Sequence, residues 1–166
     1  MAPEGGWTVE VFTADNGRAP FTTFADDLSD FTFTALDAAI QHVLAVRGID
    51  LMSTEWLKAL GHGLHEFRVR HTADEIAHMF ADEPTGEKPG PGESVLLRVF
   101  VHFHGQKVVL LLSGYDKGDD PSSKRQQREI AAARKYLTAW KEQEARRRAR
   151  ERKGKPSGAR RPAQGR

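Results

Sequence analysis

Three arginines lie inside short apolar segments that alternate in the manner of β-strands. Arg68 and Arg70 alternate with Phe67 and Val69, and Arg98 lies in a second segment of the same kind. Because every second residue of a strand points to the same side, Arg68 and Arg70 share a face. A charge in a strand is costly to bury unless it emerges on a working surface. Strands that each place a cation on the surface of the sheet therefore indicate a small sheet that binds a polyanion.

The relation between Arg68 and Arg98 depends on strand register. If the register aligns them, both point to the same side, and two guanidinium groups can clamp a phosphate and stabilise charge developing on it. The alternative is a solvated sheet face on which the arginines form ion pairs with Glu66 or Asp116. The residues alone leave both interpretations open.

Six histidines lie close together in the sequence, and two of them have a spacing that suits metal binding. His102 and His104 share one face of a strand and are a feasible pair of ligands. No carboxylate follows at a spacing that completes a known metal motif. We therefore expect no metal site and no cofactor, and predict acid–base or phosphate contacts for one of the histidines.

Tyr115 and Lys117 follow a third apolar segment. A tyrosine at the end of a strand can stack on an exposed nucleobase, and a lysine there can contact a phosphate. The alternative is that Tyr115 packs on the last helix. No phosphate-binding loop, dinucleotide glycine motif or Gly-x-Ser-x-Gly motif is present.

Strands and helices in an α+β arrangement must position these residues. The alternation predicts strands at 7–12, 65–71, 96–103 and 107–113. Pro20 predicts the start of a short helix, and a longer helix is expected over 34–47, ended by Gly48. A last helix is expected to start at Asp120 and Pro121, with an apolar stripe made of Ile130, Ala133, Leu137 and Trp140. The sequence of residues 74–80 is compatible with a short helical turn but does not establish one. The Pro/Gly/Glu-rich residues 81–94 read as a surface loop.

The composition is that of one globular domain with a basic extension. The chain has 166 residues, of which 39% are hydrophobic and 29% charged, and it has no cysteine. Its net charge of +2 hides a basic segment from Lys141 onward. We assign residues 1–140 to the domain and 141–166 to a helical extension with a disordered end. The start lacks a signal-peptide pattern, and the longest apolar run is too short to span a bilayer, so we expect a cytoplasmic protein without membrane contact.

The order of several motifs resembles toxins of the RelE/ParE superfamily, most closely the HigB-like, phage-derived branch. The motifs are Gly-Arg-Ala-Pro-Phe at 17–21 before a short helix, Leu-Lys-Ala-Leu-Gly-His-Gly-Leu-His-Glu-Phe-Arg at 57–68, Leu-Arg-Val-Phe at 97–100, and Leu-Leu-Ser-Gly-Tyr-Asp-Lys at 111–117. The similarity runs from about Trp7 to Trp140. The basic extension lies outside it.

The resemblance implies a compact α+β fold of the RelE type, with an N-terminal strand and helices on a small antiparallel sheet. It implies a type II toxin–antitoxin system, with a helix-turn-helix antitoxin as partner, and metal-independent cleavage of mRNA on the ribosome. The catalytic residues implied are Arg68, Arg98, Tyr115 and Lys117. To RNA binding we assign Lys58, His65, Arg70, His102, His104 and Lys124.

Three departures from the family pattern stand out, and each bears on activity. Acids follow Lys117 at Asp119 and Asp120 where a second lysine is usual, His65 replaces an aromatic residue, and 81–94 looks like an insertion. A histidine could then replace lysine as the proton donor. Two other functions stay open: a ParE-like toxin that inhibits DNA gyrase, and a catalytically inactive domain that binds a regulatory partner.

Overall fold

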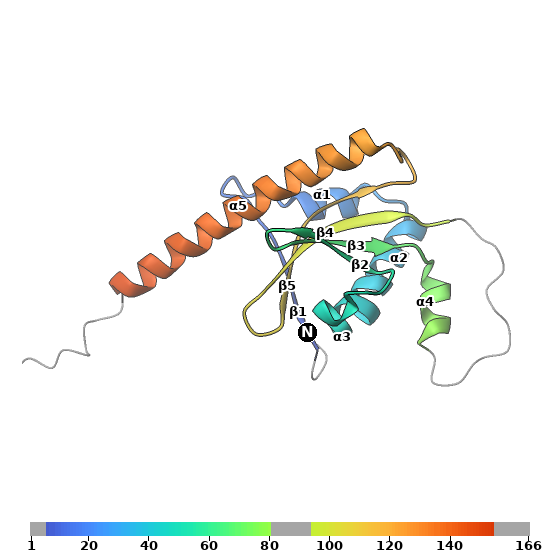
Figure 1. Ribbon diagram of the computed structural model, residues 1–166, viewed down its shortest axis with the longest axis horizontal. Helices are drawn as coiled ribbons and strands as arrows, with labels where there is room; N and C mark the ends of the chain where they lie inside the picture. Colours follow the sequence, from blue (N-terminus) through green and yellow to red (C-terminus); the bar gives the residue numbers. More distant parts are fainter. Residues whose placement is uncertain (1–5, 81–93, 155–166) are drawn as a thin grey trace, which may run out of the picture.

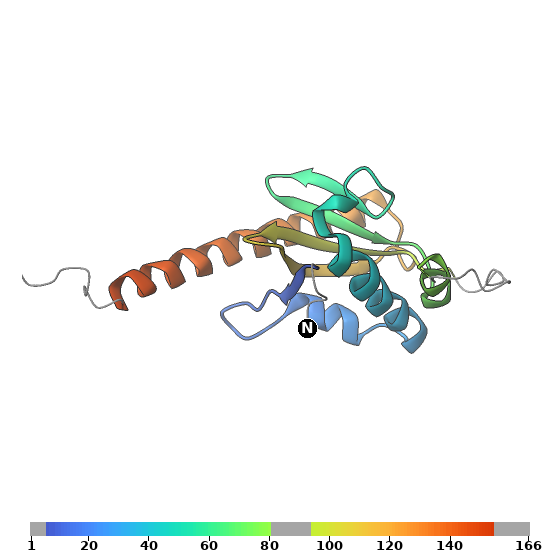
Figure 2. The same ribbon diagram turned by 90° about the horizontal axis from the view of Figure 1, so that it is seen from below.

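The computed structural model describes residues 6–80 and 94–154, and it has a five-stranded sheet with helices on both faces (Figures 1 and 2). The strands are β1 (Thr8–Val11), β2 (Leu57–Gly61), β3 (Leu64–Val69), β4 (Leu97–His104) and β5 (Val108–Asp116), in the spatial order β1-β5-β4-β3-β2. β1 runs parallel to β5, and the other neighbours are antiparallel. The predicted α+β class is confirmed.

The segment between β1 and β2 is helical. It contains α1 (Pro20–Asp26), α2 (Asp30–Ala39), a π-helical turn (Ile40–Leu44), α3 (Ala45–Arg47) and a 3-10 turn (Gly48–Leu51). Pro20 opens α1 as predicted. The helix predicted over 34–47 begins earlier, because the Ser29 hydroxyl accepts a hydrogen bond from the Thr32 N–H at 3.2 Å and caps α2. It ends where predicted, at Gly48, whose φ is +50°.

The sequence left one strand unpredicted and one helix unsettled. β2 pairs with β3 through a tight turn in which His62 has a φ of +56°. Its residues, Leu-Lys-Ala-Leu-Gly, include no β-branched or aromatic side chain, so propensity gave no signal. α4 (Ala73–Met79) forms because Thr72 and Glu75 make a capping box. The loop predicted at 81–94 lies almost wholly outside the described residues.

Each face of the sheet has its own apolar core. The N-terminal helices cover one face, where Leu36 and Leu44 join a buried cluster with Phe67 and Val99. The last helix, α5 (Ser123–Gly154), covers the other face, where Ala133 and Leu137 pack near Phe100, Leu110 and Leu112. The stripe predicted from the sequence is therefore the face of α5 that contacts the sheet.

The boundaries of α5 differ from the prediction at both ends. The helix starts after Ser122, whose hydroxyl accepts from the Arg125 N–H at 3.1 Å, whereas Asp120 only accepts from the Ser122 N–H. The division at 140/141 falls inside α5, which continues to Gly154 (Figure 1). Contacts also continue past Trp140, contrary to expectation: the Gln143 amide donates to the Thr13 carbonyl at 3.0 Å. Residues 155–166, predicted to be disordered, lie outside the described residues.

Arg146 adds a further contact of α5 with the body, 2.9 Å from the Asp15 carboxylate. β5 also extends further than predicted, through Tyr115 to Asp116, because β4 pairs with it along that whole length. Within residues 6–80 and 94–154, no helix is both long and apolar enough to cross a membrane.

Candidate functional site

A row of three side chains crosses the sheet at the end of β3, β4 and β5. Arg68 is the direct partner of Arg98 on β4, and Arg98 is the direct partner of Tyr115 on β5. Directly paired residues of neighbouring strands point to the same face. The alignment of Arg68 with Arg98, which the sequence left open because it depends on strand register, is therefore present, and the row lies on the face that α5 covers.

A buried carboxylate, Glu66, holds the two arginines of this row. Its Oε1 lies 3.0 Å from Arg68 Nε and 3.1 Å from Arg98 Nε. The Arg98 Nε–H does not point at this oxygen, so the second contact is an ion pair without a hydrogen bond. Gln126 of α5 donates to the other oxygen at 3.3 Å. The ion pairing with Glu66 that the sequence left open is present, and it fixes both guanidinium groups.

Several cations at this end of the sheet lie close enough to affect one another. Burial lowers the pKa of Lys117, and three neighbouring arginines lower it further: Arg98, Arg68 and Arg70. Burial also lowers the pKa of Arg98, although a guanidinium stays charged in a protein. The Lys117 N–H donates to the Leu96 carbonyl at 2.9 Å, which anchors the end of β5 beside β4. A bound phosphate would relieve the repulsion among these cations.

Two members of the row are not open to a ligand in this arrangement. Arg98 is buried, and Tyr115 is only 2% exposed. The Arg125 guanidinium of α5 lies over the Tyr115 ring, 5.2 Å from its centre, and Phe100 stacks at 6.1 Å. A nucleobase has no room to stack on Tyr115 here, so the predicted stacking role is not supported. The alternative, a tyrosine packed under the last helix, is what the structure has.

The histidines assigned to RNA binding lie away from the arginines. His102 and His104 are at the far end of β4, roughly 13 Å along the strand from Arg98 to His102. Both rings pack on Trp140 of α5, with centres 5.3 and 4.5 Å from it. His65 is on the opposite face, against Phe103.

The hydrogen bonds of these histidines are local to their own end of the sheet. His102 Nδ1 lies 2.7 Å from the Gly63 carbonyl oxygen, and His104 pairs with Glu10. Burial lowers the pKa of His65 and of His102, which favours neutral rings. In the part of the chain that the structure describes, no three His, Asp or Glu side chains gather in a way that could hold a metal ion.

The two lysines assigned to RNA binding are both exposed. Lys58 is exposed on β2, opposite Glu66, and Lys124 is exposed in the first turn of α5. The sequence reasoning missed Gln126, which orients Glu66. Its signal was present, because Gln126 lies four residues before Ile130 and so continues the buried stripe of α5.

Comparison of the chain with profiles of known protein families, with characterised proteins and with solved structures gave no match. The central feature is a set of four cations, Arg68, Arg70, Arg98 and Lys117, around one buried carboxylate.

Proposed function

We propose that this protein is a HigB-like toxin of the RelE/ParE superfamily, the toxic half of a type II toxin–antitoxin system, and that it cleaves mRNA on the ribosome without a metal ion. The observation that carries the proposal is the direct pairing of Arg68 with Arg98, beside a lysine whose pKa is lowered. The order of motifs along the chain supports it independently.

The proposed reaction is attack of a ribose 2′-hydroxyl on the adjacent phosphate. The P–O5′ bond breaks, leaving a 2′,3′-cyclic phosphate and a 5′-hydroxyl, and the proton of the 2′-hydroxyl leaves to solvent. Arg68, which is partly exposed, contacts the phosphate, while buried Arg98 stabilises its developing charge through the field of the row. Lys117 protonates the departing oxygen, a role that a lowered pKa favours.

Affinity for RNA comes in part from α5. Beyond Trp140 the helix projects away from the sheet (Figures 1 and 2), and its cations there are Lys141, Arg146, Arg147, Arg148, Arg150, Arg152 and Lys153. Three acids, Glu142, Glu144 and Glu151, only partly offset them. Such a helix adds attraction to phosphates that does not depend on base sequence. The proposed partner that silences the toxin is a helix-turn-helix antitoxin, and the proposed location is the cytoplasm.

Induced expression in a bacterium tests the proposal. We expect growth to stop and new mRNA 5′ ends to appear, with purified protein and ribosomes giving the same ends in the presence of EDTA. An Arg68→Ala protein, folded by circular dichroism, should give none of them. Intact mRNA together with trapped gyrase–DNA breaks would instead support the ParE-like function.

One observation favours a second candidate, a catalytically inactive domain that binds a regulatory partner. Arg98 and Tyr115 are buried beneath α5, and Lys117 has an acid on each side along the chain, Asp116 at the end of β5 and Asp119 in the turn that follows. Normal growth and intact mRNA after expression of a soluble, folded protein would favour this candidate.

A further inference from the structure

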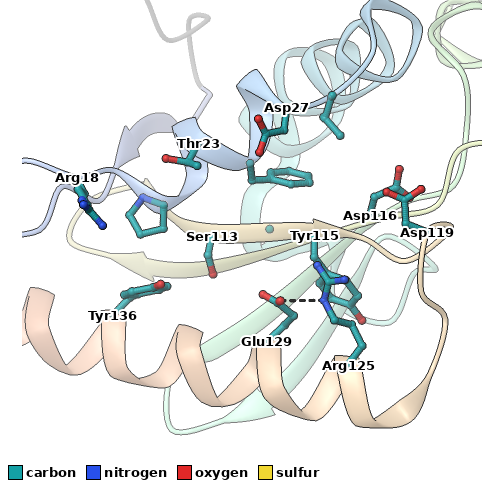
Figure 3. A pocket seen from close by; sticks show the side chains of 14 residues that line it. Arg18, Thr23, Asp27, Ser113, Tyr115, Asp116, Asp119, Arg125, Glu129 and Tyr136 are labelled. Atoms are coloured by element: carbon teal, nitrogen blue, oxygen red, sulfur yellow. Dashed lines mark hydrogen bonds and ion pairs between the residues drawn. The ribbon is translucent and has the colours of Figure 1, made fainter.

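A cleft of about 490 Å³ lies beside β5, between α1 and α5 (Figure 3). It exists because β1 pairs with β5 only as far as Leu111. After Phe12, whose N–H donates to the Leu111 carbonyl, the chain leaves the sheet. Gly114 allows α1 to approach the strand, since a Cβ there would overlap the ring of Phe24. The two helices thus face each other across the outer edge of residues 113–116.

A buried hydroxyl without a partner points into this cleft. Ser113 is 5% exposed, and its Oγ has no hydrogen bond to any residue that the structure describes. Figure 3 shows the hydroxyl directed from β5 toward α5, on the side of Glu129 and Tyr136. Leaving a buried polar group unpaired costs about 1–3 kcal/mol. A polar ligand in the cleft would offset that cost.

The lining of the cleft is acidic. Four carboxylates, Asp27, Asp116, Asp119 and Glu129, face two arginines, Arg18 and Arg125. Arg125 is already engaged, because its Nε lies 2.9 Å from Glu129 and its guanidinium covers Tyr115.

Three of the lining acids, Asp27, Asp116 and Asp119, form no ion pair with a described residue, and two of them lie together at one end of the cleft. These two are Asp116 and Asp119, and Arg18 lies at the opposite end (Figure 3). Burial, and then the charge of Asp119, raise the pKa of Asp116. This acidic end includes part of the Gly118-Asp119-Asp120 sequence, which the proposed cleavage of RNA does not use.

We propose that the α1–α5 cleft binds an organic cation, an ammonium or guanidinium group on a short alkyl chain, with the cation at Asp116 and Asp119 and a polar contact to the Ser113 hydroxyl. The ring of Phe24, which packs against Gly114 between Ser113 and Asp116, offers an apolar contact to the alkyl chain. A bound cation removes the repulsion between the two carboxylates. The same chemistry is offered by a free amine and by an arginine or lysine side chain of a partner protein. Neither case depends on RNA cleavage.

Titration of the full chain with two probes tests this site. The probes are agmatine, a free cation, and a blocked Gly-Arg-Gly tripeptide, which presents the same group as a side chain. We expect saturable binding by calorimetry at millimolar concentrations or below, with the largest amide NMR shifts at Ser113, Gly114 and Gly118. A blocked Gly-citrulline-Gly tripeptide, which has nearly the same shape without the charge, should not bind. Tighter binding of agmatine identifies a free ligand, and tighter binding of the arginine tripeptide identifies a partner's side chain.

Variants assign the binding to the named groups. Asp116→Asn with Asp119→Asn should weaken binding by about tenfold or more, because contacts to a charged group are lost. Ser113→Ala should weaken it by about fivefold, and Asp50→Asn, at an exposed position of the 3-10 turn outside the cleft, should change nothing. The absence of saturable binding by the wild type, or shifts spread over the whole acidic surface, would overturn the proposal. Unchanged affinity of a folded Asp116→Asn, Asp119→Asn double variant would also overturn the proposal. If the double variant does not fold, unchanged affinity of Ser113→Ala together with NMR shifts outside the cleft would overturn it.

Discussion

Glu66 Oε1 lies 3.1 Å from Arg98 Nε, and neither side chain is open to solvent. The same oxygen contacts Arg68, so one carboxylate holds both arginines of the row. A buried charge without its partner is strongly unfavourable. The pair therefore serves the stability of the sheet as well as the geometry of the proposed site.

Replacing Glu66 should destabilise the fold. In Glu66→Gln the Arg98 charge stays buried without a counter-ion, and we expect the free energy of unfolding to fall by about 3–5 kcal/mol. Glu10→Gln is the matched control, since Glu10 pairs with His104 at the surface, where an ion pair contributes at most about 1 kcal/mol. Urea unfolding measures both. Equal effects of the two substitutions would contradict the role given to Glu66.

Alanine substitutions of Arg68 and Arg98 should differ in their effects on cleavage activity and on stability. Arg68 is partly exposed, so Arg68→Ala should keep the fold and lower the rate of mRNA cleavage by about a hundred- to a thousandfold. Arg98→Ala removes a buried cation beside Glu66, so it should destabilise the protein as well. Thermal unfolding and single-turnover cleavage on ribosomes measure the two properties. Wild-type cleavage by a folded Arg68→Ala protein would remove this residue from the site.

Lys117 should set the alkaline limit of cleavage. As a general acid it acts in the protonated form, so the rate falls as pH rises through its pKa. Burial and the nearby arginines lower that pKa, so the fall should begin at a lower pH than for an ordinary lysine. Lys117→Arg should move the fall to higher pH, and Lys124→Arg, at an exposed position, should leave the profile unchanged. A pH profile of single-turnover rates tests this, and one that Lys117→Arg does not alter assigns the proton to another group.

Gly48 should tolerate no side chain. A Cβ at this position would overlap the indole of Trp7, and the φ of +50° is itself unfavourable for alanine. Gly17 also has a positive φ but opens onto free space, so Gly17→Ala isolates the backbone effect. We expect Gly48→Ala to destabilise the protein by about 1–3 kcal/mol more than Gly17→Ala. Similar midpoints of urea unfolding for the two variants would show that Trp7 moves aside freely.

The basic extension should affect binding more than folding. Truncation after Gly154 removes Lys155, Arg160, Arg161 and Arg166, and should leave the melting temperature unchanged while making ribosome binding weaker and less dependent on salt.

Truncation after Lys141 should also lower stability, by up to about 2 kcal/mol, because the contacts of Gln143 with Thr13 and of Arg146 with Asp15 are lost. Unfolding of the shorter protein would mean that this half of α5 is part of the domain. Unchanged binding and salt dependence in both truncations would show that the extension does not contact RNA.

Periodicity alone predicted most of the elements. Alternation located β1, β3, β4 and the start of β5, and the stripe through Leu137 identified the buried face of α5. It missed β2, whose Leu-Lys-Ala-Leu residues become a strand only because β3 offers hydrogen-bonding partners. It misplaced the start of α5, because Asp120 and Ser122 are both capable caps and local sequence does not choose between them.

The sequence by itself determined which residues share a face, because side chains alternate along a strand whatever its neighbours are. It therefore put Arg68 with Arg70, whereas its assignment of His65 to the same RNA-binding surface did not take the alternation into account, and the structure places His65 on the opposite face. Only the tertiary structure decided that Arg68 pairs with Arg98, that Glu66 is buried between them, and that α5 covers Tyr115. Strand register and the docking of α5 follow from the packing of whole faces against one another. A local sequence pattern does not encode them, because they depend on contacts between segments far apart in the chain.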